Sequence, residues 1–162
     1  MRIAIAGATG TVGRHILETA RDRGHEVVAL SRSAGQDVST GAGLVEAVAG
    51  ADAVIDVTNV LTTSATKSRQ FFTQATRNLL AAERSAGVGH HVSLSIVGID
   101  GTDAGYYAGK LAQGTGSFDR GGPMVDSASD PVPRIRRTGG AASDVRAVRA
   151  DPHDADPPRR GA

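Results

Sequence analysis

Hydrophobic positions in the first two thirds of the chain recur with two different periods, which predict alternating strands and helices. Short apolar runs bounded by glycine or polar residues predict buried strands. Longer stretches with apolar residues three and four positions apart predict helices. The strands are expected at 2–6, 26–30, 53–57 and 91–96, and the helices at 11–23, 44–48, 67–86 and from about 104 to 113.

This alternation predicts an α/β protein with a parallel sheet, because parallel neighbours are joined by a crossover that usually contains a helix. The order of elements is that of the first half of a doubly wound fold, which is incomplete after the fourth strand. Such folds bind ligands beyond the carboxyl ends of their strands. The candidate site therefore consists of the residues that follow each strand, at 7–12, 31–32, 58–59 and 95–97.

The composition changes after Gln113. Residues 1–113 contain eight leucines and no proline, whereas residues 114–162 contain no leucine, all six prolines, no Lys and no Glu. A segment without periodic apolar positions cannot bury a core, so we expect a folded domain at 1–113 and a low-complexity, disordered tail at 114–162. Without a following strand, the fourth strand is expected to be an unpaired sheet edge.

The genetic code offers one explanation for this tail. If one extra base follows the codon of Gln113, reading the next codons from their second position converts Met124-Val125 into a tryptophan codon. The shifted frame can encode a continued helix, a turn and an apolar strand. A genuine disordered extension is the alternative, and sequencing the gene across this codon distinguishes the two.

Composition also limits the class of protein. A formal net charge of +1 gives no reason to expect a nucleic-acid partner, and the absence of cysteine excludes disulfides and thiolate metal sites. His90 and His91 are adjacent on a strand and point to opposite faces, so no metal site is predicted. No apolar run reaches the roughly 20 residues of a membrane span. A soluble, cytoplasmic protein is expected.

The most informative motif is Gly7-x-x-Gly10-x-x-Gly13, which follows the first strand and opens the first helix. Gly7 permits a tight turn, Gly10 lets the backbone approach a phosphate, and Gly13 lets the helix pack closely on the strand. Thr9 and Thr11 add hydroxyl groups beside the helix N-terminus, where backbone amides attract anions. The motif predicts a dinucleotide pyrophosphate site; a glycine-rich turn without a ligand is the alternative.

The end of the second strand bears on the choice of cofactor. Proteins that bind NAD usually carry an acid there, about 20 residues past the glycines, to hold the ribose 2′-hydroxyl. Here the sequence is Leu30-Ser31-Arg32-Ser33. A guanidinium can pair with a 2′-phosphate, so NADP(H) is preferred and NAD(H) stays possible. The alternative is that Arg32 is a solvated surface residue.

Tyr106-x-x-x-Lys110 lies on the last predicted helix. Residues four apart share a helix face, and a nearby ammonium lowers the pKa of a phenol, which suits it for proton transfer to or from a carbonyl. Ser95, at the end of the fourth strand, could polarise that carbonyl. The alternative is that Tyr106 is an ordinary amphipathic surface residue.

Together these motifs resemble the atypical branch of the short-chain dehydrogenase/reductases, the NAD(P)H-binding, NmrA-like group. The resemblance covers 1–113 and also includes Asp52-Ala-Val-Ile-Asp56-Val-Thr-Asn59 and Leu94-Ser95-Ile-Val-Gly98. It implies a Rossmann fold and a nicotinamide cofactor. Family members continue past the Tyr-x-x-x-Lys helix into another strand and a smaller substrate-binding region, which have no recognisable counterpart here.

The resemblance also implies roles for individual residues. By match, cofactor-binding residues would be Gly7, Thr9, Gly10, Thr11, Val12 and Arg32. Asn59 and Ser95 would line the nicotinamide side, and Tyr106 and Lys110 would be the catalytic pair. Gly13, Ser31 and Thr58 complete the candidate cofactor site by their positions next to the strands.

The sequence therefore predicts an NADP(H)-binding oxidoreductase for a small carbonyl or related substrate, with turnover impaired by the altered segment after Gln113. Two other functions stay open: a non-catalytic NADP(H) sensor that regulates a partner, and a nucleotide-sugar epimerase or dehydratase. The expected partner is a small molecule rather than a nucleic acid or a membrane. The long helix at 67–86 could serve a homodimer.

Overall fold

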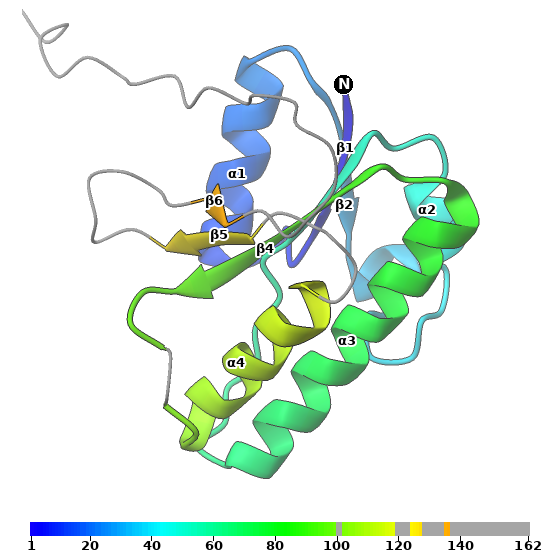
Figure 1. Ribbon diagram of the computed structural model, residues 1–162. Coiled ribbons are helices and arrows are strands. Elements are labelled where there is room, and N and C mark those ends of the chain that lie inside the picture. Colours follow the sequence, from blue (N-terminus) through cyan, green and yellow to red (C-terminus); the bar gives the residue numbers. More distant parts are fainter. Residues whose placement is uncertain (100–101, 119–123, 128–134, 137–162) are drawn as a thin grey trace, which may run out of the picture.

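The computed structural model describes residues 1–99, 102–118, 124–127 and 135–136 (Figure 1). Most of the segment 114–162 lies outside these residues, so its disorder stays a prediction. The strands are β1 (Arg2–Ala6), β2 (Glu26–Leu30), β3 (Ala53–Asp56), β4 (His90–Ile96), β5 (Met124–Ser127) and β6 (Ile135–Arg136). The helices are α1 (Thr11–Asp22), a short 3-10 helix η1 (Arg32–Ala34), α2 (Leu44–Val48), α3 (Ala65–Ala86) and α4 (Gly105–Phe118).

The helix boundaries differ from the predicted ones where a local contact decides them. Helix α3 begins two residues early because Ser64 caps it, with its Oγ accepting from the backbone N of Lys67 at 3.3 Å. The helix ends as predicted, at Gly87, which adopts a left-handed conformation. None of the described helices is long and apolar enough to cross a lipid bilayer.

Helix α4 continues past the predicted end at Gln113, although glycine weakens a helix. One of its glycines is a packing contact rather than a helix end. A Cβ atom at Gly109 would lie 2.1 Å from the Oγ of Ser68 on α3. That same Oγ donates to the backbone O of Tyr106 at 2.7 Å. The glycine therefore lets α4 approach α3 closely enough for this hydrogen bond.

The sheet confirms the predicted α/β, Rossmann-like fold. Its strand order is β2-β1-β3-β4-β5-β6, with β1 to β5 parallel and β6 antiparallel. The predicted unpaired edge beside β4 is wrong, because β5 pairs along it from Ser93 to Ile96. Composition could not reveal this strand, since backbone pairing with an existing strand needs only a few residues in extended conformation.

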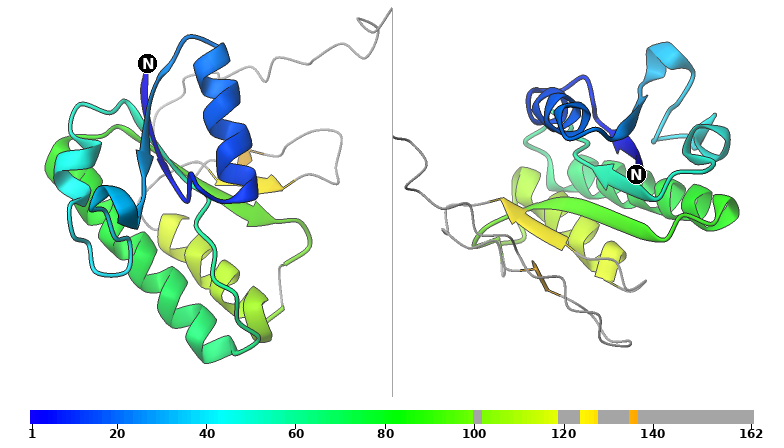
Figure 2. Two further views of the ribbon diagram at one scale, coloured as in Figure 1. Left: turned by 180° about the vertical axis from the view of Figure 1, so that it is seen from behind. Right: turned by 90° about the horizontal axis from the view of Figure 1, so that it is seen from above.

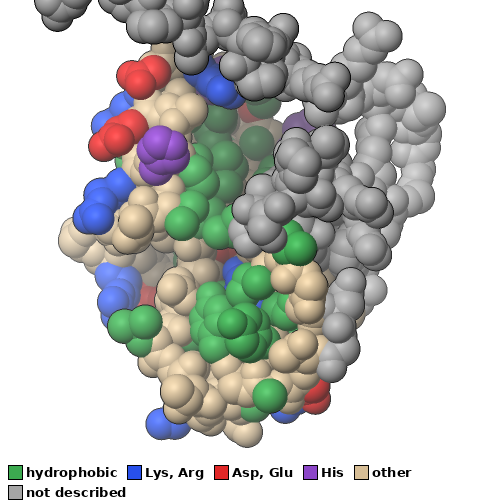
Figure 3. Space-filling view, turned by 90° about the vertical axis from the view of Figure 1, so that its left-hand side faces the viewer, with side chains coloured by type: hydrophobic (Ala, Val, Ile, Leu, Met, Phe, Trp, Pro, Cys, Tyr) green, Lys and Arg blue, Asp and Glu red, His purple; other side chains and the backbone are tan. Residues whose placement is uncertain are grey.

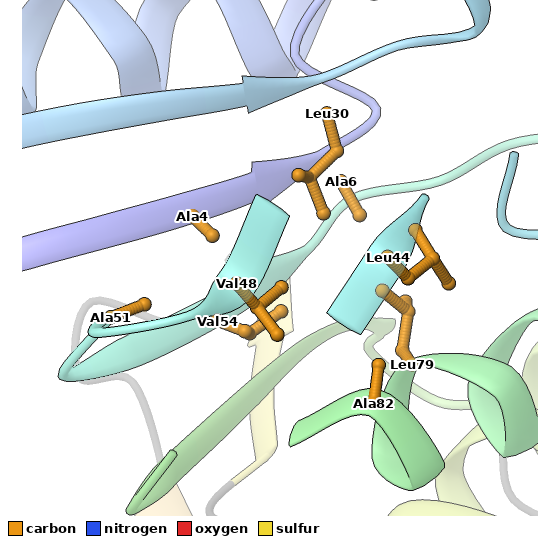
Figure 4. Close-up of a cluster of buried hydrophobic side chains, with 9 residues drawn as sticks. All are labelled: Ala4, Ala6, Leu30, Leu44, Val48, Ala51, Val54, Leu79 and Ala82. Atoms are coloured by element: carbon orange, nitrogen blue, oxygen red, sulfur yellow. The ribbon is translucent and has the colours of Figure 1, made fainter. Parts of the chain in front are cut away.

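Figure 2 shows α1 on one face of the sheet and α3 and α4 on the other. Two hydrophobic clusters hold these layers together, one on each face of the sheet. Alternate residues of β1 point to opposite faces, so Ala4 and Ala6 join one cluster and Ile3 and Ile5 the other. The first cluster packs β1 and β3 against α2 and α3 (Figure 4). The second packs the sheet against α1 through Ala20 and its neighbours. This layering places the N-terminus of α1 beside the carboxyl ends of β1 and β3.

Candidate cofactor and active site

The turn between β1 and α1 has room only for glycine at two of its three predicted positions. Gly7 has a φ of 84°, and a Cβ atom there would lie 2.7 Å from the backbone O of Val57. A Cβ atom at Gly13 would lie 2.1 Å from the backbone O of Gly7. Side chains at these positions would collide with backbone that cannot rotate away. The tight turn predicted at Gly7 and the close packing predicted at Gly13 are thus present.

The first turn of α1 is open to an anion. Gly10 is the N-cap residue and provides no side-chain cap for the first backbone amides. Thr9, Thr11 and Val12 around it are exposed. Uncapped amides at a helix N-terminus carry partial positive charge and bind phosphate groups. This turn therefore fits the pyrophosphate of a dinucleotide.

The end of β2 presents Arg32 to solvent. Arg32 opens the 3-10 helix η1, and no carboxylate forms an ion pair with it in the described part of the chain. Beside it, the hydroxyl groups of Ser31 and Ser33 lie 3.0 Å apart. The backbone N of Ser31 donates to the side chain of Gln36 at 3.3 Å, which fixes the start of this turn. A guanidinium without an acidic partner can donate hydrogen bonds to a phosphate.

An open hollow of about 710 Å³ lies beyond the end of β3. It is lined by Asn59, Val60, Leu61, Thr62, Thr63 and Tyr106. Viewed from the side on which β4 ends, hydrophobic side chains gather on this face (Figure 3). The hollow brings together the predicted residues Asn59 and Tyr106. The loop residues 60–63 were missed, because neither their types nor their spacing marks a site.

Tyr106 does not have the lowered pKa that the Tyr-x-x-x-Lys spacing predicts. Burial and the neighbouring Tyr107 raise the pKa of its phenol above the usual value. Its ring packs edge-to-face on Phe72 and Tyr107, with ring centroids 5.7 and 5.9 Å away. The prediction was wrong because it assumed that the Lys110 ammonium lies beside the phenol.

Lys110 instead points into the protein interior, with 3% of its surface exposed. Its Nζ donates to the backbone O of Leu94 at 2.6 Å and to the Oε1 of Gln113 at 2.5 Å. The same ammonium lies 4.8 Å from the centre of the Phe72 ring. Burial lowers the pKa of Lys110 to about 8, against the opposing effect of the Asp56 carboxylate. In this structure the lysine joins α4 to β4.

Asp56 is a further buried polar residue, to which its sequence motif assigned no role. Its Oδ2 accepts from the Nε2 of Gln113 at 2.8 Å. Its Oδ1 accepts from the backbone N and the hydroxyl of Thr58, at 2.9 and 2.7 Å. The hydroxyl of Thr58, a predicted site residue, is therefore directed inward. This network links α4 to the end of β3, next to the glycine turn.

A second buried network joins His91 and Ser93, which lie on one face of β4, to Glu83 of α3. The Nδ1 of His91 lies 2.7 Å from Glu83 Oε1, and its Nε2 lies 2.8 Å from Ser93 Oγ. All three side chains are at least 95% buried. Ser95, the predicted polarising group, lies on the same face of β4 and is also buried. His91 thus connects β4 to α3.

Titration of His91 is expected to make stability depend on pH. Burial by itself lowers the pKa of His91, but Glu83, with a smaller contribution from Asp56, outweighs it and the pKa is raised. The folded state therefore binds the proton more tightly than the unfolded chain. The resulting stability is full below about pH 6.5 and is lost as the pH rises through the folded-state pKa.

The expected result is that His91→Gln loses more unfolding free energy at about pH 5.5 than at about pH 8.5, relative to the unmodified protein. Urea denaturation at the two pH values measures this difference. His90→Gln, at the exposed neighbouring position, is the matched control. An equal loss at both pH values would show that the proton on His91 does not stabilise the fold.

A parallel sheet with a glycine-lined, uncapped helix N-terminus at the carboxyl end of its first strand defines a dinucleotide-binding α/β protein. A family model described as NAD(P)H-binding matches residues 7–113. Because this match covers more than half of the chain, the chain belongs to this NAD(P)H-binding family.

Known proteins of several kinds resemble the chain. It is 33% identical over 111 residues to the photosystem II assembly factor Ycf39 of Synechocystis, which covers 60% of this chain and 34% of that protein. The chain thus spans about a third of the length of this curated relative. It also resembles the UDP-N-acetylglucosamine 4-epimerase of Bacillus cereus, at 21% identity and a TM-score of 0.65, over 78% of this chain and 57% of that chain.

A third similar structure is a short-chain dehydrogenase/reductase superfamily protein from Agrobacterium tumefaciens with bound NAD. It is 23% identical, with a TM-score of 0.60, over 78% of this chain and 48% of that chain. At these identities the two solved structures show the fold alone.

Proposed function

We propose that this protein is a cytoplasmic, NmrA-like oxidoreductase that binds NADP(H) and reduces a small carbonyl compound. The observation that carries the proposal is the pair formed by the uncapped N-terminus of α1 and the guanidinium of Arg32, which has no ion-pair partner among the described residues. The first suits the pyrophosphate and the second suits a 2′-phosphate. The family match supports nicotinamide binding. The choice of NADP(H) over NAD(H) rests on Arg32.

Tyr106 is the residue best placed to handle a proton. When bound, the reduced nicotinamide supplies a hydride to the carbonyl carbon, and the carbonyl oxygen then needs a proton. Tyr106 lines the uncharged hollow next to Asn59. Its raised pKa keeps the phenol protonated at neutral pH, so the phenol can donate that proton. The uncharged lining suits a neutral substrate.

Replacing Tyr106 with Phe tests this role. The Phe variant keeps the ring contacts with Phe72 and Tyr107 but lacks the proton, so turnover is expected to fall about 100-fold or more. NADPH affinity is expected to stay within about twofold. NADPH oxidation with a panel of neutral aldehydes, ketones and quinones measures turnover, and calorimetric titration measures NADPH affinity. Tyr107→Phe is the matched control, and unchanged turnover in the Tyr106 variant would remove the proposed proton donor.

A non-catalytic NADP(H) sensor is the second candidate. It is favoured by the position of Lys110, whose ammonium is held by Leu94 and Gln113 inside the protein rather than beside the phenol of Tyr106. A sensor is expected to bind NADPH and to oxidise none of the panel. The unmodified chain distinguishes the two functions, because turnover that depends on Tyr106 supports the enzyme.

A further inference from the structure

Gln113 lies between two buried groups of opposite charge. Its Oε1 accepts from the Nζ of Lys110 at 2.5 Å, and its Nε2 donates to the Oδ2 of Asp56 at 2.8 Å. All three side chains are at least 97% buried. Among the ion pairs of the described residues, none joins Lys110 directly to Asp56. The amide of Gln113 therefore connects the two charges and keeps them apart.

The chemistry of the two charged groups fixes the orientation of this amide. An ammonium donates hydrogen bonds and accepts none, whereas a carboxylate only accepts them. The oxygen of Gln113 must therefore face Lys110, and its nitrogen must face Asp56. A Glu side chain at this position would have no hydrogen to donate to Asp56, and a Met side chain would serve neither group. Position 113 thus requires a donor and an acceptor at the end of a side chain of this length.

The same contacts attach α4 to two strands of the sheet. Asp56 is the last residue of β3, and the Nζ of Lys110 also donates to the backbone O of Leu94 on β4 at 2.6 Å. Tyr106, Lys110 and Gln113 are four and three residues apart, so they follow one side of α4. Tyr106 lies seven residues before Gln113, which is about 10.5 Å along a helix. The depth at which α4 lies against the sheet therefore also sets the position of Tyr106.

Neither buried charge can lose the amide without cost. The Oδ1 of Asp56 is already used by Thr58, so Gln113 serves the other carboxylate oxygen. Burial lowers the pKa of Lys110 to about 8, and the Asp56 carboxylate opposes this only in part. A charge that loses a hydrogen-bond partner in the interior is strongly destabilising. We expect α4 to move when position 113 no longer fits both groups.

We propose that Gln113 is a positioning residue of the candidate active site, which through Asp56 and Lys110 holds α4 at the depth that places the phenol of Tyr106 in the hollow beside Asn59. Gln113 itself contacts neither substrate nor cofactor. The inference rests on the proposed function in one respect, the role of Tyr106 as proton donor. The position of the phenol can be measured without any reaction.

Tyrosine fluorescence provides this measurement, because the chain has two tyrosines and no tryptophan. Tyr107→Phe leaves Tyr106 as the sole tyrosine, and acrylamide quenching of its fluorescence reports how exposed the ring is. In this background, Gln113→Glu is expected to raise the quenching constant about twofold, since two buried carboxylates then repel each other and displace α4. Gln70→Glu, the same substitution at an exposed position of α3, is the matched control and should leave quenching unchanged.

A compensating substitution separates this role from a general need for glutamine. Adding Asp56→Asn to Gln113→Glu exchanges the two groups, because the new amide can donate to the new carboxylate while its oxygen still accepts from Thr58. Quenching is expected to return to the control value. In NADPH oxidation, kcat is expected to fall about tenfold in Gln113→Glu, with the KM for NADPH within about twofold, and to recover in the double variant.

The outcomes distinguish the position of Tyr106 from its chemistry. Unchanged quenching in Gln113→Glu, or a double variant as strongly quenched as the single one, would overturn the proposal. If Gln113→Glu does not fold, a folded double variant with control quenching supports it, and an unfolded double variant overturns it. Absence of NADPH oxidation by the unmodified chain would remove the proposed reaction alone, since the quenching results do not depend on turnover.

Discussion

Replacing Arg32 with Ala is expected to lower the affinity for NADPH about 10- to 100-fold while leaving that for NADH nearly unchanged. Hydrogen bonds to a charged group contribute about 1.5–3 kcal/mol, and each 1.4 kcal/mol is a tenfold change in affinity. Arg32 is exposed and has no described ion-pair partner, so the substitution removes little from the fold itself. Calorimetric titration with each cofactor measures the effect.

Arg21→Ala is the matched control for this experiment. Arg21 is also exposed, but it lies in the last turn of α1, at the opposite end from the glycine turn. Its removal should change neither affinity. If Arg32→Ala weakened the binding of NADPH and NADH equally, the guanidinium would be contacting a group common to both cofactors. Arg32 would then not recognise the 2′-phosphate.

Replacing Gly13 with Ala is expected to cost about 3 kcal/mol of unfolding free energy and most of the NADPH affinity. The added Cβ would lie 2.1 Å from the backbone O of Gly7 and 2.7 Å from the Cα of Ala8. Both are backbone atoms, so relief requires the start of α1 to move away from β1. That movement displaces the amides proposed to hold the pyrophosphate. Urea denaturation and cofactor titration measure the two losses.

Gly89→Ala is the control for the added methyl group. Among the described residues other than its chain neighbours, no atom lies within 4 Å of a Cβ built at Gly89, and its φ is not in the left-handed region. This variant should retain both stability and affinity. A Gly13→Ala protein with the stability and affinity of Gly89→Ala would mean that the turn is loose enough to accept a side chain, contrary to the packing described here.

Local sequence patterns predicted most of the fold. The bounds of β1, β2 and α2 agree with the predicted ones: Gly7 follows β1, Ser31 follows β2, and Gly43 precedes α2. Errors occur where tertiary contacts override composition. Helix α4 continues past Gln113 because it packs on α3, and β5 forms beside β4 although its segment lacks a clear apolar pattern.

The candidate site was predicted unevenly for a related reason. Spacing identifies which residues share a turn or a helix face, and so Gly7 and Gly13 could be recognised in advance. Spacing does not determine whether a long side chain points outward or inward. Lys110 finds the backbone O of Leu94 and the side chain of Gln113 in the interior, and these partners are distant in sequence or unremarkable in type. The roles of Tyr106, Lys110 and Ser95 in catalysis therefore stay predictions.

The contact between Ser68 and Gly109 has a consequence for exchanging parts between relatives. The Ser68 hydroxyl donates to the Tyr106 carbonyl and occupies the space that a Cβ at position 109 would need. These two contacts fix the position of α4 along the axis of α3. A chimera that imports α4 alone, with a larger residue at 109, would shift the tyrosine along the helix axis. Transferring α3 and α4 together would preserve the position of Tyr106 relative to the sheet.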